Sequence, residues 1–184
     1  NDEVNKLAQV PVGAGNDFLA RSRSTYGLTY KTALLAGGAY APPAGSYPVS
    51  SGTTLTTLSK RLQMAAHMID VLGTQIITIH WGGFDTHTSQ LVNQDKQFKE
   101  LSRALAAFQA DLEARGVADR VLTLVWSEFG RRAQENESSG TDHGAGGIAW
   151  VQGTRAASGI LTDYPSLTDL DREDNLKVTV DFRK

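Results

Sequence analysis

Five side chains of a kind that binds metal ions lie in three short segments of this 184-residue chain. The segment GGFDTH holds Asp85 and His87, WSEFGRR holds Glu128, and GTDHG holds Asp142 and His143. Imidazole nitrogen and carboxylate oxygen together suit borderline divalent ions such as zinc and manganese. If the three segments meet in the folded chain, the sequence therefore predicts a divalent metal site.

Each of these residues also has a structural interpretation. Asp85 can close a turn after Gly83, and His87 can bond a loop carbonyl. Asp142 and His143 can be ordinary residues of a polar loop. Taken singly, these structural interpretations are favoured over metal binding. Only the combination of donors on three loops indicates a functional site.

Two arginines follow Glu128, and each can either bind an anionic substrate or make a structural ion pair. Arg131 is our candidate catalytic residue, because a planar guanidinium group can form paired hydrogen bonds with a phosphate or sulfate. An ion pair of Arg131 or Arg132 with Glu128 is the plainer interpretation. The other two histidines, His67 and His80, fall within regular apolar patterns, and we interpret them as packing residues.

Two apolar runs are expected to position the candidate ligands. Residues 75–80, QIITIH, and residues 121–126, VLTLVW, are typical of strands buried on both faces of a parallel sheet. A strand, a helix and a second strand at this spacing form a right-handed crossover, so the two strands should be parallel neighbours. Their carboxyl ends then share one edge, which places Asp85, His87 and Glu128 beside one crevice.

Helical periodicity flanks the first run on both sides. Apolar residues recur at helical spacing over residues 55–72 and stop at Gly73, which suits a C-terminal cap. A second helix is predicted between an N-terminal cap at Thr88 or Ser89 and a stop near Gly116. Alternating apolar residues predict a last strand over residues 176–182.

These elements predict an α/β fold, with a mainly parallel sheet flanked by helices, in one domain. Residues 1–54 are poorly periodic and are broken by glycine and proline, so we expect surface connections there. Residues 55–184 hold the regular elements. The chain starts without methionine and stops directly after a predicted strand, so we expect an incomplete domain, either a fragment or a processed product.

Composition narrows the functional classes. The formal net charge of -2 is spread along the chain without a basic stripe, so nucleic acid is not an expected partner. No apolar run is long enough to span a bilayer. The absence of cysteine excludes disulfides and thiolate chemistry. The chain also lacks a G-x-S-x-G elbow, a Walker lysine and a dinucleotide fingerprint.

Four motifs, in this order, resemble the C-terminal half of the DUF1501 family: GGFDTH, VLTLVWSEFGRR, GTDHGAGG and YPSLTDLDREDNLKVTVDFR. The resemblance covers residues 55–184, and residues 1–54 match only loosely. It implies a bacterial protein exported with a twin-arginine signal to the periplasm or cell surface. It also implies a fold similar to the alkaline phosphatase and sulfatase superfamily, of which residues 55–184 would form the C-terminal half.

That superfamily implies a metal-dependent hydrolase of phosphate or sulfate esters, with a small anionic ester as substrate. By motif, Asp85 and His87 resemble one of its ligand pairs. Asp142 and His143 resemble a later histidine-bearing loop, and Glu128 stands where an Asp-His pair often follows a strand. The implied cofactor is a divalent ion: zinc, manganese or calcium. The resemblance places the nucleophile outside this chain.

A second class of function stays open. An exported binding or scaffold protein would keep the fold without catalysis, and the polar motifs would then serve to fix loops. Glu128 would pair with Arg131 or Arg132, and Asp85 would close its turn. Metal binding by the purified chain separates the two hypotheses.

Overall fold

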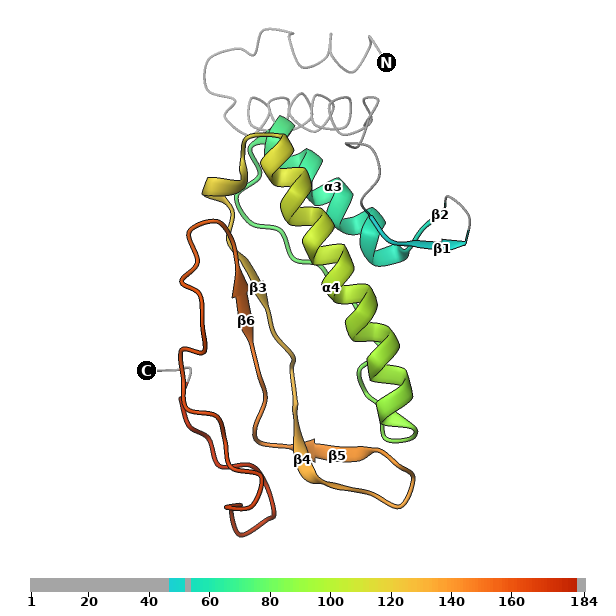
Figure 1. Cartoon of the computed structure of the whole chain (residues 1–184), viewed down its shortest axis with the longest axis vertical. Coiled ribbons are helices and arrows are strands. Elements are labelled where there is room, and N and C mark those ends of the chain that lie inside the picture. Colours follow the sequence, from blue (N-terminus) through green and yellow to red (C-terminus); the bar gives the residue numbers. More distant parts are fainter. Residues whose placement is uncertain (1–46, 52–53, 182–184) are drawn as a thin grey trace, which may run out of the picture.

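The computed structural model describes residues 47–51 and 54–181, and its regular part is built on two helices (Figure 1). Helix α3 (Thr57–Leu72) and helix α4 (Gln90–Ala114) pack against each other, and a short 3-10 helix, η1 (Ala118–Arg120), follows α4. Both predicted helices are therefore confirmed. The surface connections predicted over residues 1–54 fall almost entirely outside the described residues.

Both helices end at the predicted glycines, whereas Ser89 makes no side-chain capping hydrogen bond at the start of α4. The Thr56 hydroxyl accepts a hydrogen bond from the Ser59 backbone N–H (3.2 Å), which satisfies one of the free N–H groups at the start of α3. Gly73 ends α3 in the left-handed conformation (φ 63°), and Gly116 turns the chain after α4 in the same way (φ 68°). Glycine adopts this conformation without steric cost, so it stops both helices.

The hydrophobic core lies between α3 and α4. Ala66 and Ala104 are fully buried there, and their short side chains let the helices approach closely. Leu112 is also fully buried. The other buried apolar residues are Tyr47, Leu58, Leu62, Ala65, Leu101, Leu105, Ala107, Phe108, Val117 and Ala118.

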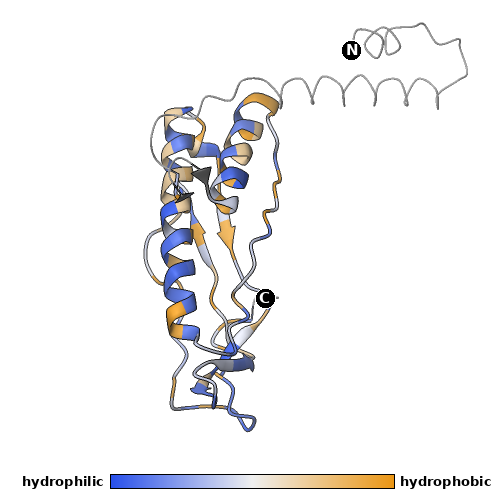
Figure 2. Ribbon diagram, turned by 90° about the vertical axis from the view of Figure 1, so that its right-hand side faces the viewer, coloured by the Kyte–Doolittle hydropathy of each residue, from blue (hydrophilic) through white to orange (hydrophobic). Residues whose placement is uncertain are grey.

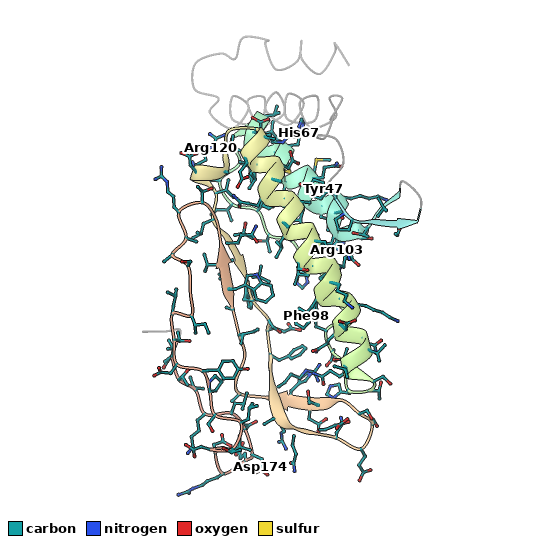
Figure 3. The ribbon with its side chains drawn as sticks, viewed as in Figure 1. Tyr47, His67, Phe98, Arg103, Arg120 and Asp174 are labelled. Carbon is teal, nitrogen blue, oxygen red and sulfur yellow. The ribbon has the colours of Figure 1, made fainter. Side chains whose placement is uncertain are left out.

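A polar network crosses this core. The buried Tyr47 hydroxyl donates to the Asp111 carboxylate (3.0 Å), as its position beside the helices suggests (Figure 3). Arg115 donates to the same carboxylate (2.7 Å) and reaches Asp70 on α3 (2.9 Å). Because buried polar groups must be paired, this network joins both helices and the chain that enters β1.

The strands form three separate two-stranded antiparallel sheets. The pairs are β1 with β2, β3 with β6, and β4 with β5. Their bounds are β1 (Val49–Ser51), β2 (Thr54–Leu55), β3 (Thr123–Val125), β4 (Gly130–Glu135), β5 (Thr141–Gly144) and β6 (Trp150–Gln152). The β3–β6 ribbon runs beside α4, and the β4–β5 hairpin lies near the N-terminal end of α4 (Figure 1).

The prediction of an α/β fold with a mainly parallel sheet flanked by helices is wrong. Residues 75–80 are extended but form no strand, and their exposure alternates: Ile76 is 86% exposed, whereas Ile77 and Ile79 pack against the core. Strand β3 pairs antiparallel with β6, because the β4–β5 hairpin turns the chain back between them. The helices therefore cover one face of the ribbon, and the alkaline-phosphatase-like architecture is not observed.

The C-terminal segment also departs from prediction. No strand forms over the described part of residues 176–182, where Val178 and Val180 are exposed and only Leu176 makes an isolated bridge, to Leu170. Asp171 holds the intervening turn by accepting the backbone N–H groups of Glu173 and Asn175 (both 2.8 Å). Alternation of apolar residues is not sufficient for a strand when no partner strand lies beside it.

Helix α4 and the β3–β6 ribbon differ in hydropathy. Most of α4 is hydrophilic in Figure 2, while the ribbon strands beside it are largely hydrophobic. No helix within the described residues has the length and apolar character needed to cross a membrane.

We expect Leu112→Ala to lower the free energy of unfolding by about 2–5 kcal/mol, because it opens a cavity at a fully buried position. The matched control is Leu91→Ala, on the same helix at a side chain that is 84% exposed, for which a change within about 0.5 kcal/mol is expected. Urea unfolding of both variants measures the difference. Equal losses would contradict the burial of Leu112 in the core between α3 and α4.

Candidate metal centre

Three of the five predicted ligands converge on one point. An oxygen of the Asp85 carboxylate lies 3.0 Å from His87 Nε2 and 2.7 Å from His143 Nε2. One ligand atom from each residue lies within 4.8 Å of the others. Asp85 and His87 come from the loop before α4, and His143 comes from β5. The centre therefore joins two segments that lie more than fifty residues apart in sequence.

Asp142 contacts His87 from the other side of its ring. The Asp142 carboxylate lies 3.2 Å from His87 Nδ1, so this nitrogen donates a hydrogen to the carboxylate and Nε2 points to Asp85. Metal-bound histidines usually have such a carboxylate behind the ring, where it fixes the tautomer and orientation. Asp142 thus fixes the orientation of the His87 ring.

Ring stacking fixes His143. Its imidazole stacks on the Phe129 ring, with centroids 4.0 Å apart and planes 8° apart. The His87 ring also stacks with it, with centroids 4.9 Å and planes 28° apart. Contacts with two rings limit the freedom of the side chain to leave Asp85.

Backbone hydrogen bonds hold the β4–β5 hairpin against the start of α4. The Ser89 N–H donates to the Ser138 carbonyl (3.1 Å), and the Gln90 N–H donates to the Ser139 carbonyl (2.8 Å). The Thr141 hydroxyl donates to the Gln90 side chain (2.8 Å). Carbonyl oxygens of the hairpin turn thereby satisfy N–H groups at the start of the helix, where no intrahelical partner exists.

Asn136 connects the hairpin turn to both sides of the centre. Its side-chain N–H₂ donates to the His87 carbonyl (3.1 Å) and to the Asp142 carboxylate (3.3 Å). Its side-chain oxygen accepts the backbone N–H groups of Ser138 and Gly140 (both 3.0 Å). One amide side chain therefore sets the turn and the position of two residues of the centre.

Arg131 ties the loop that holds Asp85 to the hairpin. Its guanidinium donates to the Phe84 carbonyl (2.6 Å) and to the Thr141 carbonyl, and it lies 3.5 Å from the Asp85 carboxylate. It also lies over the Phe129 ring, and its side chain is only 16% exposed. Two of its N–H groups donate to backbone carbonyls, and the buried Nε–H has no partner among the described residues. The ion pair of Arg131 is with Asp85 and not with the predicted partner Glu128.

Hydrogen bonds keep both carboxylates ionised. The hydrogen bond from His143 lowers the pKa of Asp85 below its usual 3.8, with help from the charges of His87, His143 and Arg131. Hydrogen bonds from Asn136 and then His87 lower the pKa of Asp142. Both groups are exposed, and ionisation makes each a better partner for a cation.

Glu128 lies outside the group of three converging donors. It is exposed, in the short connection between β3 and β4. Arg132 is exposed as well, and its charge helps to lower the pKa of Asp142. His67 is buried in α3, as predicted. His80 is exposed at the end of the extended segment, so its interpretation as a packing residue is wrong. Neither belongs to the group of converging donors.

Two residues that shape the centre were missed from the sequence: Asn136 and Phe129. Asn136 stands at the start of a polar turn, NESSG, where an asparagine side chain commonly accepts the N–H two residues later. That signal predicts the turn but not the contact with His87. Phe129 has no signal in the sequence, because stacking depends on where the hairpin brings His143.

The three donors are partly exposed to solvent. The Asp85, His87 and His143 side chains are 61%, 43% and 47% exposed. A structural zinc site is closed by four protein ligands, whereas a catalytic site has three protein ligands and an open position. Three partly exposed donors converge among the described residues, so this arrangement differs from a closed site of four protein ligands.

We expect the Asp85 carboxyl group to titrate below pH 3.8, and its midpoint to rise in His143→Ala, which removes the main cause of the lowered pKa. A group with a lowered pKa in the folded state stabilises the protein above its unfolded pKa. That contribution is lost as the pH falls through the lowered value. Carboxyl NMR titration measures the midpoint.

Asp171 is the internal control for this titration, because backbone N–H groups of Asn175 and Glu173 lower its pKa. Its midpoint should not change in His143→Ala. An unchanged Asp85 midpoint in the variant would contradict the hydrogen bond that we assign.

We expect Gly140→Ala to separate the hairpin from the loop that holds His87. A methyl group at position 140 would lie 2.2 Å from the His87 carbonyl oxygen, so one backbone must move. Such overpacking typically costs about 1–3 kcal/mol. The change should appear as shifted imidazole resonances of His87 and His143. The control is Gly82→Ala, where nothing lies within 4 Å of the added methyl. Unshifted resonances in Gly140→Ala would contradict this close approach.

Comparison with known sequences and structures identifies a family for the chain but no known fold and no activity. No curated protein and no solved structure matches it. One family model matches residues 39–179, which include the whole centre, and its description is "Protein of unknown function (DUF1501)". The chain therefore belongs to the DUF1501 family.

Proposed function

We propose that this protein is a metal-dependent hydrolase of phosphate or sulfate esters. The observation that carries the proposal is the convergence of one carboxylate oxygen and two imidazole Nε2 atoms, 2.7 and 3.0 Å apart, at an open position. Ligand bonds of about 2.0–2.2 Å around a tetrahedral zinc ion put ligand atoms about 3.3–3.5 Å apart. A shift of a few tenths of an ångström would bring these donors to that spacing.

The chemistry of the donors favours zinc or manganese. Two imidazoles and one carboxylate suit borderline ions, whereas calcium takes six to eight oxygen ligands. Asp85 carries the negative charge that such an ion needs, and its lowered pKa keeps that charge in place. Asp142 keeps His87 Nε2 directed at the same point. Glu128, which lies outside the converging group, is then not required as a ligand.

A bound divalent ion at this point would polarise the ester and lower the pKa of a bound water. Residues of the protein would select for an anionic substrate. Arg131 lies 3.5 Å from the Asp85 carboxylate and adds a fixed positive charge beside the centre, which attracts an anionic ester. Because two of its N–H groups are bonded to backbone carbonyls and its Nε–H is buried, Arg131 would act through its charge without a paired hydrogen bond to the substrate.

The resemblance to the alkaline phosphatase and sulfatase superfamily supports the same activity, although the fold predicted from it is wrong. Export to the periplasm or cell surface belongs to the same proposal.

One observation favours the scaffold hypothesis as the second candidate. Asp85 already contacts His87, His143 and Arg131, so these charges can satisfy one another and hold the loop to the hairpin without an ion. In that case His87 and His143 donate to Asp85 and have no free lone pair at Nε2. Metal analysis of the purified chain decides between the two candidates.

We expect the purified chain to bind about one equivalent of zinc or manganese, and His87→Ala and His143→Ala to lose it. At free metal one hundred times the dissociation constant, binding adds about 2.7 kcal/mol to the stability of wild type. Elemental analysis and thermal unfolding with and without chelator measure both effects. The control is His80→Ala, which removes an exposed imidazole outside the centre and should bind metal as wild type does.

Wild-type protein that binds no metal at the centre would exclude the hydrolase proposal and support the scaffold hypothesis. Loss of metal in Glu128→Gln would show instead that Glu128 is a ligand. Phosphate and sulfate monoesters tested with metal-loaded wild type and His87→Ala then show whether the centre hydrolyses either class.

A further inference from the structure

The extended segment of residues 75–80 has no strand partner among the described residues. Its backbone N–H groups make no hydrogen bond in that part of the structure, and no backbone N–H group donates to its carbonyls. Ile77 and Ile79 face the core, while Ile76 and Thr78 are exposed on the other side. Extended backbone with unsatisfied groups and alternating side chains is a template for another strand.

A groove of about 460 Å³ follows this segment along α3. Its wall is partly apolar, from Met64, Met68, Ile77 and Ile79. Lys60 and Arg61 add two positive charges, and no acidic residue is present among the described residues that line it. The Arg61 guanidinium donates to the His80 carbonyl and so fixes the end of the segment to α3. The groove therefore combines open backbone groups with a basic, apolar wall.

We propose that residues 75–80 dock an extended acidic peptide segment of a partner protein, which adds to them as a β-strand. Hydrogen bonds between the two backbones supply affinity, and alternate side chains supply specificity. Apolar residues of the peptide would contact Met64 and Met68, and its carboxylates would lie beside Lys60. This inference does not depend on the metal centre.

Other occupants fit these observations less well. A helix uses its own backbone groups internally and leaves those of residues 75–80 unpaired. A second copy of the chain brings the same uncharged segment and the same lysine and arginine. It therefore offers no carboxylate to pair with the basic side chains of the groove. An extended segment with acidic residues satisfies both the backbone and the charge.

The test uses labelled synthetic peptides and the full chain. One peptide alternates valine and glutamate, the second has lysine in place of glutamate, and the third is the first with an N-methyl group on every amide. Fluorescence anisotropy should show about tenfold tighter binding of the glutamate peptide than of the lysine peptide. The N-methylated peptide should not bind, because it cannot donate to the segment. Amide hydrogen exchange should slow over residues 75–80.

A charge-reversed variant sharpens the test. Lys60→Glu should weaken the glutamate peptide at least about threefold and improve the lysine peptide. Lys96→Glu makes the same change at an exposed position on α4, outside the groove, and should leave both affinities unchanged.

Three outcomes would overturn the proposal. They are equal binding of the glutamate and lysine peptides, binding of the N-methylated peptide, and protection that appears along β3 or β6 but not over residues 75–80. Association of the chain with itself through residues 75–80, detected by light scattering in the absence of peptide, would assign the segment to a second copy and would also overturn it.

Discussion

The centre depends on the contact between the turn of the β4–β5 hairpin and the start of α4. A helix start leaves N–H groups without partners, and here the carbonyls of Ser138 and Ser139 accept two such groups at Ser89 and Gln90. The same contact brings His143, on β5, to Asp85 and His87, on the loop before α4. The same contact therefore satisfies the N–H groups at the start of α4 and brings the residues of the centre together.

Small and planar groups make this contact close enough. Gly140 leaves room for the His87 carbonyl, which a side chain there would displace. The Arg131 guanidinium and the Asn136 amide each bond to both the hairpin and the loop, so they hold the two segments together. These bonds join the hairpin directly to the loop. The geometry of the centre therefore depends less on the packing of α3 against α4 than on the hairpin. Core substitutions should change stability more than ligand positions.

The two helices could be predicted from the sequence because their signals are local. Helical periodicity and the glycines at 73 and 116 act within a few residues. The sheet could not be predicted in this way. The apolar run at residues 75–80 suits a strand in any sheet, and only a neighbouring strand decides whether it pairs. Strand β3 pairs with β6 because a hairpin at residues 130–144 reverses the chain, and the polar sequence of that hairpin resembles a loop.

The convergence of Asp85, His87 and His143 was expected for a reason that the structure does not support. The sequence argument used the shared edge of two parallel strands, which would have brought Glu128 to the centre as well. The structure uses an antiparallel hairpin instead, and it leaves Glu128 outside while it places Asp142 behind His87. Residue types can indicate which side chains are suited to hold an ion. Which of them face the common point and which lie behind another donor depends on the face to which each strand residue points, because neighbouring residues on a strand point to opposite faces. In β5 this rule separates Asp142 from His143, and the two adjacent donors contact different atoms of the centre.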